Sequence, residues 1–167
     1  MEYLNRFAQD GNGGIWRLDL SFSASSENPK QLFSYHAGVI NGIGCCPNSH
    51  FFATTADDGS IKVYDYLTYD IIAQARFKNS GTSLKWLSSI IDPDGATICV
   101  GYSDGLLRFL KLHPNDMYGK DKNAKTPYDL VLFEIFKPHT KPITKLSINN
   151  SGSIIVTGVS YFLFIMT

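Results

Sequence analysis

Polar and apolar residues alternate along three segments that each follow a glycine. Gly13 opens GGIWRLDL, Gly59 opens GSIKVYDY and Gly105 opens GLLRFLKL. Such alternation is typical of a strand with one face in a hydrophobic core. The two intervals between the glycines, 13 to 59 and 59 to 105, are both 46 residues long. We therefore predict successive, insertion-free copies of one sheet-forming module.

The residues between these glycines predict further short strands. In the middle copy we expect strands over residues 39–45, 51–55, 60–64 and 71–77, separated by turns rich in Pro, Asn, Asp and Gly. No segment has a helical period over ten residues or more. A four-stranded antiparallel meander repeated around an axis is the plan of a β-propeller, so the predicted fold class is all-β.

A second register extends the repeat to the end of the chain. His36 precedes Gly59 by 23 residues, and His139 precedes Phe162 by the same 23. Phe162 lies 57 residues after Gly105, which exceeds the repeat by 11 residues. The polar stretch 113–127 contains the excess and is predicted to be an inserted surface loop whose charges are solvated.

These registers divide the chain into blades. The expected units are a partial blade 13–35, a blade 36–77, a blade 78–136 with the insertion 113–127, and a partial blade 137–167. A propeller needs at least four blades, so the sequence predicts an incomplete propeller that is a fragment or one part of a larger ring. The ending SYFLFIMT is interpreted as a truncated or mispredicted reading frame, with a membrane-binding or partner-binding tail as the alternative.

Composition narrows the function classes. The 167 residues are 44% hydrophobic and carry 15 Lys and Arg against 15 Asp and Glu. This balance gives no electrostatic footprint for nucleic acid or an anionic membrane. Three cysteines cannot form a disulfide framework, and the N-terminus lacks the pattern of a signal peptide. We therefore expect an intracellular, cytoplasmic protein that binds neither nucleic acid nor membrane.

The best copy resembles the WD-repeat family. It has His36 before the first strand, Thr54 in the second, Asp58 in the turn before the third, and Tyr64 followed by an aspartate at the end of the third. The resemblance implies a buried hydrogen-bonded relay of these side chains, in which the Tyr64 hydroxyl replaces the indole of the family's usual tryptophan.

The other copies keep only part of this pattern. The third copy retains Asp104 but has Val100 and Leu110 where a hydroxyl and an indole would stand. The last copy retains His139 and Thr157 but has a tyrosine where the aspartate belongs. The resemblance therefore assigns structural roles to His36, Thr54, Asp58, Tyr64, Asp104, His139 and Thr157.

A narrower resemblance concerns scaffold proteins of motile cilia. The segments GGIWRLDLSFS, HAG, ATTADDGSIKVYD, DPDGATICVGYSDGLLRFL and FKPHTKPITKL look like the WD-repeat region of such scaffolds and occur in the same order. This implies a non-catalytic component of the axoneme, within the cytoskeleton of a cilium or flagellum. The implied partners are inner-arm axonemal dynein, a sister WD-repeat protein and the doublet microtubule. The alternative is a generic WD-repeat adaptor in another intracellular complex.

Three further patterns suggest chemistry but have structural explanations. Residues 101–105 match G-x-S-x-G, which raises the alternative of a serine hydrolase using Ser103, but the repeat places this string between two strands rather than before a helix. Cys45, Cys46 and His50 lack a fourth metal ligand. The glycine-rich stretch 11–14 is interpreted as a hairpin turn. The sequence thus predicts no catalytic, cofactor or metal site.

Overall fold

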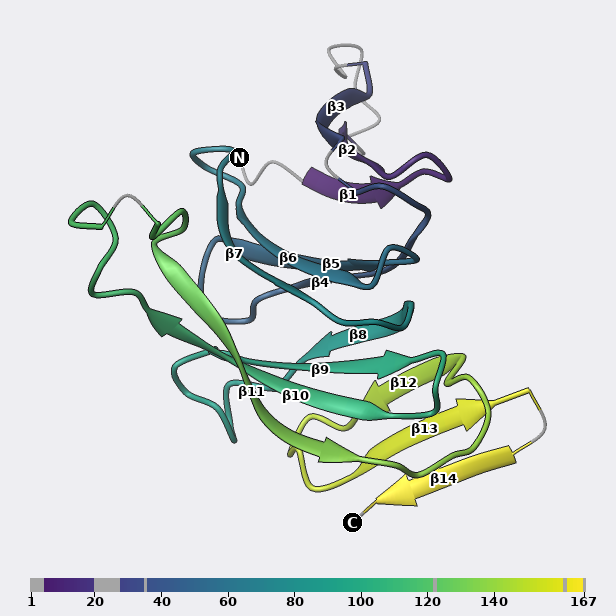
Figure 1. The fold of residues 1–167 in the computed structure, drawn as a ribbon. Coiled ribbons are helices and arrows are strands. Elements are labelled where there is room, and N and C mark those ends of the chain that lie inside the picture. The colour runs from purple at the N-terminus through teal and green to yellow at the C-terminus, as the bar shows by residue number, and fades with distance from the viewer. Residues whose placement is uncertain (1–4, 20–27, 35, 122, 161, 167) are drawn as a thin grey trace.

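Strands are the only regular secondary structure in the residues that the structure describes. The computed structural model describes residues 5–19, 28–34, 36–121, 123–160 and 162–166. They form fourteen strands in four antiparallel sheets (Figure 1). The prediction of an all-β fold made of meanders is confirmed. None of the described residues forms a helix long and apolar enough to cross a membrane.

Each sheet is a meander of strands that follow one another in the chain. The first sheet has the order β1–β2–β3, with bounds Asn5–Gln9, Gly14–Asp19 and Lys30–Ser34. The second has the order β4–β5–β6–β7, with bounds Ile40–Cys45, Phe51–Ala56, Ser60–Asp65 and Ile71–Arg76.

The third sheet, β8–β9–β10–β11, also has four strands, with bounds Gly81–Trp86, Thr97–Tyr102, Leu107–Pro114 and Tyr128–Phe136. The fourth is β12–β13–β14, with bounds Lys145–Ile148, Ile155–Val159 and Phe162–Met166. The described residues thus form two four-stranded sheets between two three-stranded ones, which agrees with the predicted two full blades flanked by partial ones.

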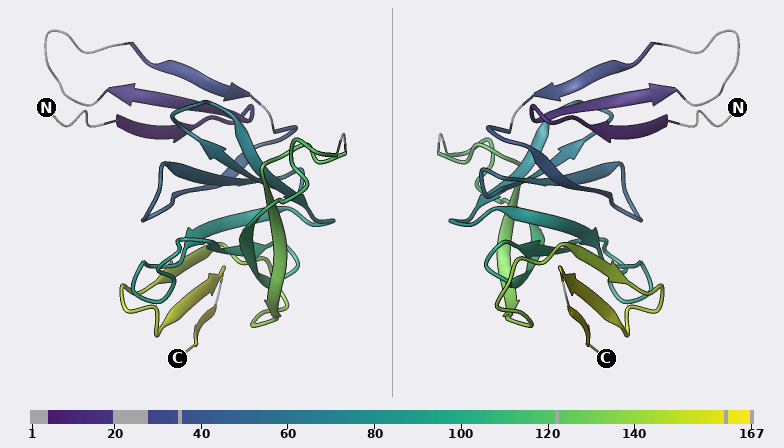
Figure 2. Two further views of the ribbon diagram at one scale, coloured as in Figure 1. Left: turned by 90° about the vertical axis from the view of Figure 1, so that its left-hand side faces the viewer. Right: turned by 90° about the vertical axis from the view of Figure 1, so that its right-hand side faces the viewer.

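The four sheets are stacked one after another (Figure 2), and the core lies between successive sheets. Phe52 and Tyr64 of the second sheet pack with Ile15 of the first. The other face of the second sheet packs on the third through a larger cluster that includes Val63 and Trp86. A third cluster joins the third sheet to the fourth. β9 lies between two of these clusters and is buried along its whole length.

The three repeat glycines are needed for the same structural reason. Gly13, Gly59 and Gly105 have φ of 83°, 76° and 78°, a left-handed conformation that favours glycine. Each also lies against a backbone carbonyl of the linker that leads into the next sheet: that of His36, Phe77 or His139, where a Cβ would overlap the oxygen. The 46-residue spacing of these glycines therefore marks the points where a linker between sheets passes over the turn that contains the glycine.

The copies are not insertion-free, so that prediction is wrong. In the first interval the β2–β3 connection takes residues 20–29 and the β4–β5 connection residues 46–50. In the second interval the β6–β7 connection takes residues 66–70 and the β8–β9 connection residues 87–96. A long and a short loop exchange places, and the two intervals remain equal because loop lengths vary without disturbing the strands.

Two boundaries also differ from expectation. The first sheet begins at Asn5 rather than at residue 13, because β1 pairs with β2 along its full length. Only two of the five residues of β1 are apolar, so its pattern was too weak to be recognised. The insertion begins after Pro114, because His113 and Pro114 continue β10 and pair with the start of β11.

Candidate functional site

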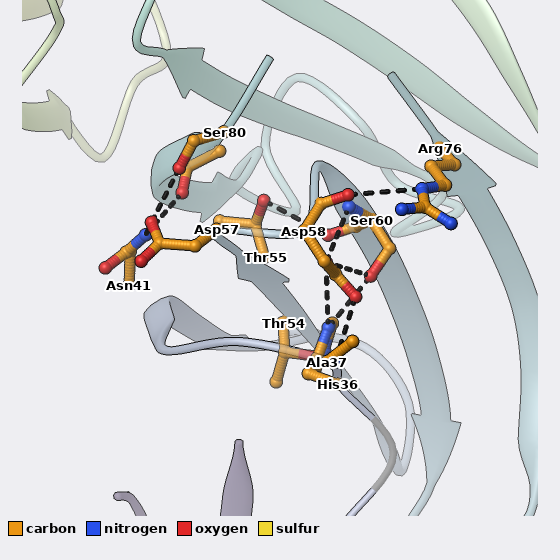
Figure 3. A network of polar contacts seen from close by, with 11 residues as sticks. His36, Ala37, Asn41, Thr54, Thr55, Asp57, Asp58, Ser60, Arg76 and Ser80 are labelled. Carbon is orange, nitrogen blue, oxygen red and sulfur yellow. Dashed lines mark hydrogen bonds and ion pairs between the residues drawn. The ribbon is translucent and has the colours of Figure 1, made fainter. Parts of the chain in front are cut away.

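A chain of hydrogen bonds joins four side chains at one edge of the second sheet (Figure 3). His36 is 7% exposed, and its Nε2 lies 2.7 Å from Thr54 Oγ1. Its Nδ1 lies 2.9 Å from Ser60 Oγ. The Ser60 hydroxyl donates to Asp58 Oδ1 at 2.6 Å, so Ser60 accepts the proton of Nδ1 and Nε2 accepts the Thr54 hydroxyl. The relay thus fits a neutral imidazole.

The electrostatics of the relay agree with this assignment. Burial lowers the pKa of His36, against the opposing charge of Asp58. Burial would raise the pKa of Asp58, but hydrogen bonds from Ser60 and from the Ala37 N–H, together with the nearby His36, outweigh it and lower that pKa to about 2. A neutral histidine and an ionised carboxylate are therefore the stable pair at neutral pH.

Ser60 is the fourth member of the hydrogen-bonded relay, in place of the Tyr64 that the resemblance assigned to it. Tyr64 lies in β6 and is fully buried, with its ring stacked on Phe52 at 4.9 Å between centroids. The Tyr64 hydroxyl is not part of the hydrogen-bond chain that joins His36, Thr54, Ser60 and Asp58. Tyr64 contributes packing against the first sheet. Ser60 lies two residues after Asp58, and this spacing was the sequence signal that could have identified it.

The fourth sheet brings together the second predicted pair. His139 Nε2 lies 2.9 Å from Thr157 Oγ1, and both residues are buried. The sequence separation is 18 residues, the same as between His36 and Thr54. Tyr161, expected in place of the aspartate, lies outside the described residues.

The third sheet replaces the histidine by a buried arginine that the sequence analysis missed. Arg108 Nη2 donates to Asp104 Oδ2 at 3.0 Å, and Asn79 Nδ2 donates to the same oxygen at 2.6 Å. The Arg108 guanidinium lies 4.1 Å from the centroid of the Tyr102 ring and 5.0 Å from that of Phe77. Burial would raise the pKa of Asp104, but hydrogen bonds from Arg108, the Leu106 N–H and Asn79, together with the charge of Arg108, outweigh it and lower that pKa. A polar residue in the alternating strand after Gly105 was the available signal.

A second aspartate in the same turn ties neighbouring sheets together. Asp57 Oδ1 accepts hydrogen bonds from Asn41 Nδ2 and Ser80 Oγ, each at 2.7 Å (Figure 3). Asn41 also donates to the Gly81 carbonyl at 2.9 Å. These bonds connect the second sheet to the linker and first strand of the third. The polar groups at this edge are therefore engaged in holding the blades in place.

Ser103 lies in a turn between two strands, β9 and β10, and not before a helix. Its backbone N–H donates to the Ser80 carbonyl at 3.0 Å, and Gly105 N–H closes the turn on Tyr102. Two histidines follow in the chain: His113 lies near the far end of β10, opposite Asp129, and His139 bonds Thr157. A nucleophile elbow needs a strand-to-helix turn, and this geometry does not supply it.

The cysteines and the glycine-rich stretch also have structural positions. Cys46 is buried and its Sγ donates to the Gly95 carbonyl at 3.3 Å, while Cys45 is exposed and His50 contacts Asp65. Within the described ranges no three His, Cys, Asp or Glu side chains gather in a way that could hold a metal. Residues 11–13 form the turn of the β1–β2 hairpin.

Comparison with known proteins decides the family. The pattern described as "WD domain, G-beta repeat" matches residues 27–65 and 131–161. The chain carries WD repeats. It is 40% identical over 153 residues to Cilia- and flagella-associated protein 44 of Mus musculus, covering 90% of this chain. It is 24% identical over 148 residues to WD repeat-containing protein 90 of the same species. The predicted resemblances are confirmed.

Solved structures show the same fold. The C-terminal WD40 domain of Sif2 superposes with a TM-score of 0.67 at 15% identity, over 95% of this chain and 41% of that domain. A chain of the mitotic checkpoint complex superposes with a TM-score of 0.72 at 16% identity, over 98% of this chain and 46% of that one. The WD-repeat chain spans 8% of the length of the ciliary relative and less than half of either solved chain.

Proposed function

We propose that this WD-repeat chain belongs to a non-catalytic scaffold of the ciliary or flagellar axoneme, where it binds other proteins and helps to tether or regulate inner-arm dynein. The observation that carries the proposal is the 40% identity to a cilia- and flagella-associated protein over 90% of the chain. The two relatives described above are cilia-associated and WD repeat-containing by name.

Rigid display is the proposed mechanism. The hydrogen bonds that Asp57 accepts from Asn41 and Ser80 fix the second sheet against the third. Apolar clusters fill the spaces between sheets. Loops anchored at both ends by such strands lose little conformational entropy on binding, so more of the contact energy appears as affinity. A scaffold gains specificity from this arrangement without any reacting group.

The proposed partners are axonemal dynein, a sister WD-repeat protein and the doublet microtubule, and the proposed location is the cytoskeleton of the cilium. Proximity labelling tests this assignment. A biotin ligase fused to the protein in a ciliated cell should label dynein heavy chains, tubulin and the sister protein above the level of the same ligase targeted to the cilium alone. Recovery of non-ciliary complexes alone would overturn the ciliary role.

The proposed non-catalytic role can be tested separately with a chemical probe. Ser103 should not react with a fluorophosphonate probe, because it lies in a turn between two strands and not in the strand-to-helix turn of a nucleophile elbow. Labelling that disappears in Ser103→Ala would establish a hydrolase instead.

A further inference from the structure

The two edges of the stacked sheets expose different side chains. We call the edge with the turns 57–59 and 103–106 and the linker 77–80 the relay edge. The opposite edge carries the connections 46–50, 66–70, 87–96 and 115–127, and we call it the loop edge (left in Figure 1). Large exposed apolar side chains gather on the connections of the loop edge: Leu67, Tyr69, Ile90, Ile91, Met117 and Tyr118.

The relay edge offers a partner much less apolar surface. Its large exposed apolar residues within the described ranges are Val39 and, at the end of β11, Ile135 and Phe136. The carboxylates of Asp57, Asp58 and Asp104 accept hydrogen bonds from the protein itself. Exposed apolar side chains that gather on one surface mark interaction sites more often than singly scattered ones do. The loop edge is therefore the better candidate for contact with other proteins.

A groove on the loop edge is built jointly by the insertion and the second sheet. It has a volume of about 550 Å³. The second sheet contributes Phe51, Asp65 and Asp70, and the insertion side contributes Tyr118 and Tyr128. The rings of Phe51 and Tyr128, which both line it, meet edge to face at 5.8 Å. We call this space the insertion groove.

The charges of the insertion groove favour a cation. The Asp65 carboxylate is fixed by the N–H groups of Leu67 at 2.8 Å and Thr68 at 3.3 Å and by His50 at 3.1 Å. The Asp70 side chain is exposed and accepts no hydrogen bond from the described part of the chain. The lining also has one lysine, Lys125, which is exposed at the rim, and His50, which contacts Asp65. Asp70 is therefore the exposed carboxylate of the groove.

Aromatic rings beside a carboxylate suit a particular ligand chemistry. A lysine ammonium or arginine guanidinium can pair with a carboxylate while it lies over the face of a tyrosine ring. The apolar residues of the lining, which include Phe51 and Ile71, suit an aliphatic or aromatic side chain next to that cation. A single extended segment can place both in a groove of this size.

We propose that the insertion groove binds an extended polypeptide segment of a partner protein that carries a lysine or arginine beside an apolar side chain. The cation pairs with Asp70 and lies against Tyr118, and the apolar side chain packs on Phe51 and Tyr128. This inference deepens the proposed scaffold function and rests on it, since it names the surface and the partner chemistry.

Peptide binding tests the proposal. The probe is a fluorescein-labelled Leu-Arg-Leu-Arg-Leu peptide, compared by fluorescence anisotropy with the same peptide carrying Glu for Arg. We expect the arginine peptide to bind at least tenfold more tightly than the glutamate peptide. Asp70→Lys should weaken it at least tenfold, and Tyr118→Ala several-fold. Both positions are exposed, so the variants should keep the circular dichroism spectrum of the parent chain.

The matched control is Asp94→Lys, the same charge change at an exposed residue of the loop edge outside the groove lining. It should leave the affinity within twofold. Equal binding of the two peptides, no binding of the arginine peptide at millimolar concentration, or equal loss in Asp94→Lys and Asp70→Lys would overturn the groove. Because the assay needs no cilium, its failure is distinct from non-ciliary labelling, which would overturn the axonemal role alone.

Discussion

At the scale of single residues, the relay shows how a sheet edge tolerates buried polar groups. His36 and Thr54 lie where water does not reach them, and each finds its partner inside the protein. A buried donor or acceptor that loses its partner costs about 1–3 kcal/mol. The relay therefore contributes less through its net hydrogen-bond energy than through the penalty for breaking it.

Removal of the imidazole should expose this penalty. His36→Ala leaves the Thr54 and Ser60 hydroxyls without their ring partner, and we expect the free energy of unfolding to fall by about 1–3 kcal/mol. Urea unfolding followed by circular dichroism measures the change. The control is His113→Ala, whose side chain is exposed near the end of β10 and which should change stability by about 0.5 kcal/mol or less. Equal effects at the two sites would contradict the account.

The pH dependence follows from the lowered pKa of His36. The unfolded chain takes up this proton near pH 6.5, whereas the folded chain does so only at lower pH. Stability should therefore fall as the pH drops below 6.5, because the unfolded state binds more protons there. Melting temperatures between pH 8 and pH 5 should fall less steeply in His36→Gln than in the parent. A parent whose stability rises over this range would refute the neutral imidazole.

The repeat glycines give a test that separates backbone conformation from side-chain chemistry. Gly59→Ala forces a Cβ onto the Phe77 carbonyl and keeps φ at 76°. The left-handed conformation alone costs about 1–2 kcal/mol, and the overlap adds to it, so urea unfolding should show a loss of at least this size. Gly11→Ala in the β1–β2 turn has open space around its Cβ and should be nearly neutral. A neutral Gly59→Ala would show that the linker does not cross this turn.

At the scale of strands and turns, the sequence predicted the strands of the second sheet to within one residue. Their boundaries coincide with Gly, Asn, Asp and Pro clusters, and alternation identifies the buried face. The sequence could not reveal that a long loop and a short loop exchange places, since only the sum appears in the glycine spacing. Arg108 was missed for a related reason: a core cation depends on partners such as Asn79 that no local pattern links to it.

The insertion can be tested as an element. β10 and β11 pair as far as Pro114 and Tyr128, so replacing residues 115–127 by Asn-Gly should close the hairpin and retain both strands. Because loop-closure entropy changes slowly with length, we expect the free energy of unfolding to shift by no more than about 2 kcal/mol. The arginine peptide should no longer bind. An unfolded product would show that the insertion belongs to the core.

At the scale of the whole molecule, stability depends on contacts between neighbouring sheets. Each apolar cluster lies between two sheets, so no sheet could bury its faces alone. The solved propellers that superpose on this chain are more than twice as long as the part it covers. The scaffold proposal and the insertion groove both require that successive blades stand side by side in one fixed arrangement.

A nuclear Overhauser measurement tests this packing most directly. Trp86 Nε1 donates to the Gly44 carbonyl at 2.8 Å across the space between the second and third sheets. The indole proton of Trp86 should therefore show cross-peaks to the Gly44 α-protons, alongside the cross-strand peaks of Ala53 with Val63 within one sheet. Intact cross-strand peaks without any peak between Trp86 and Gly44 would contradict the propeller arrangement.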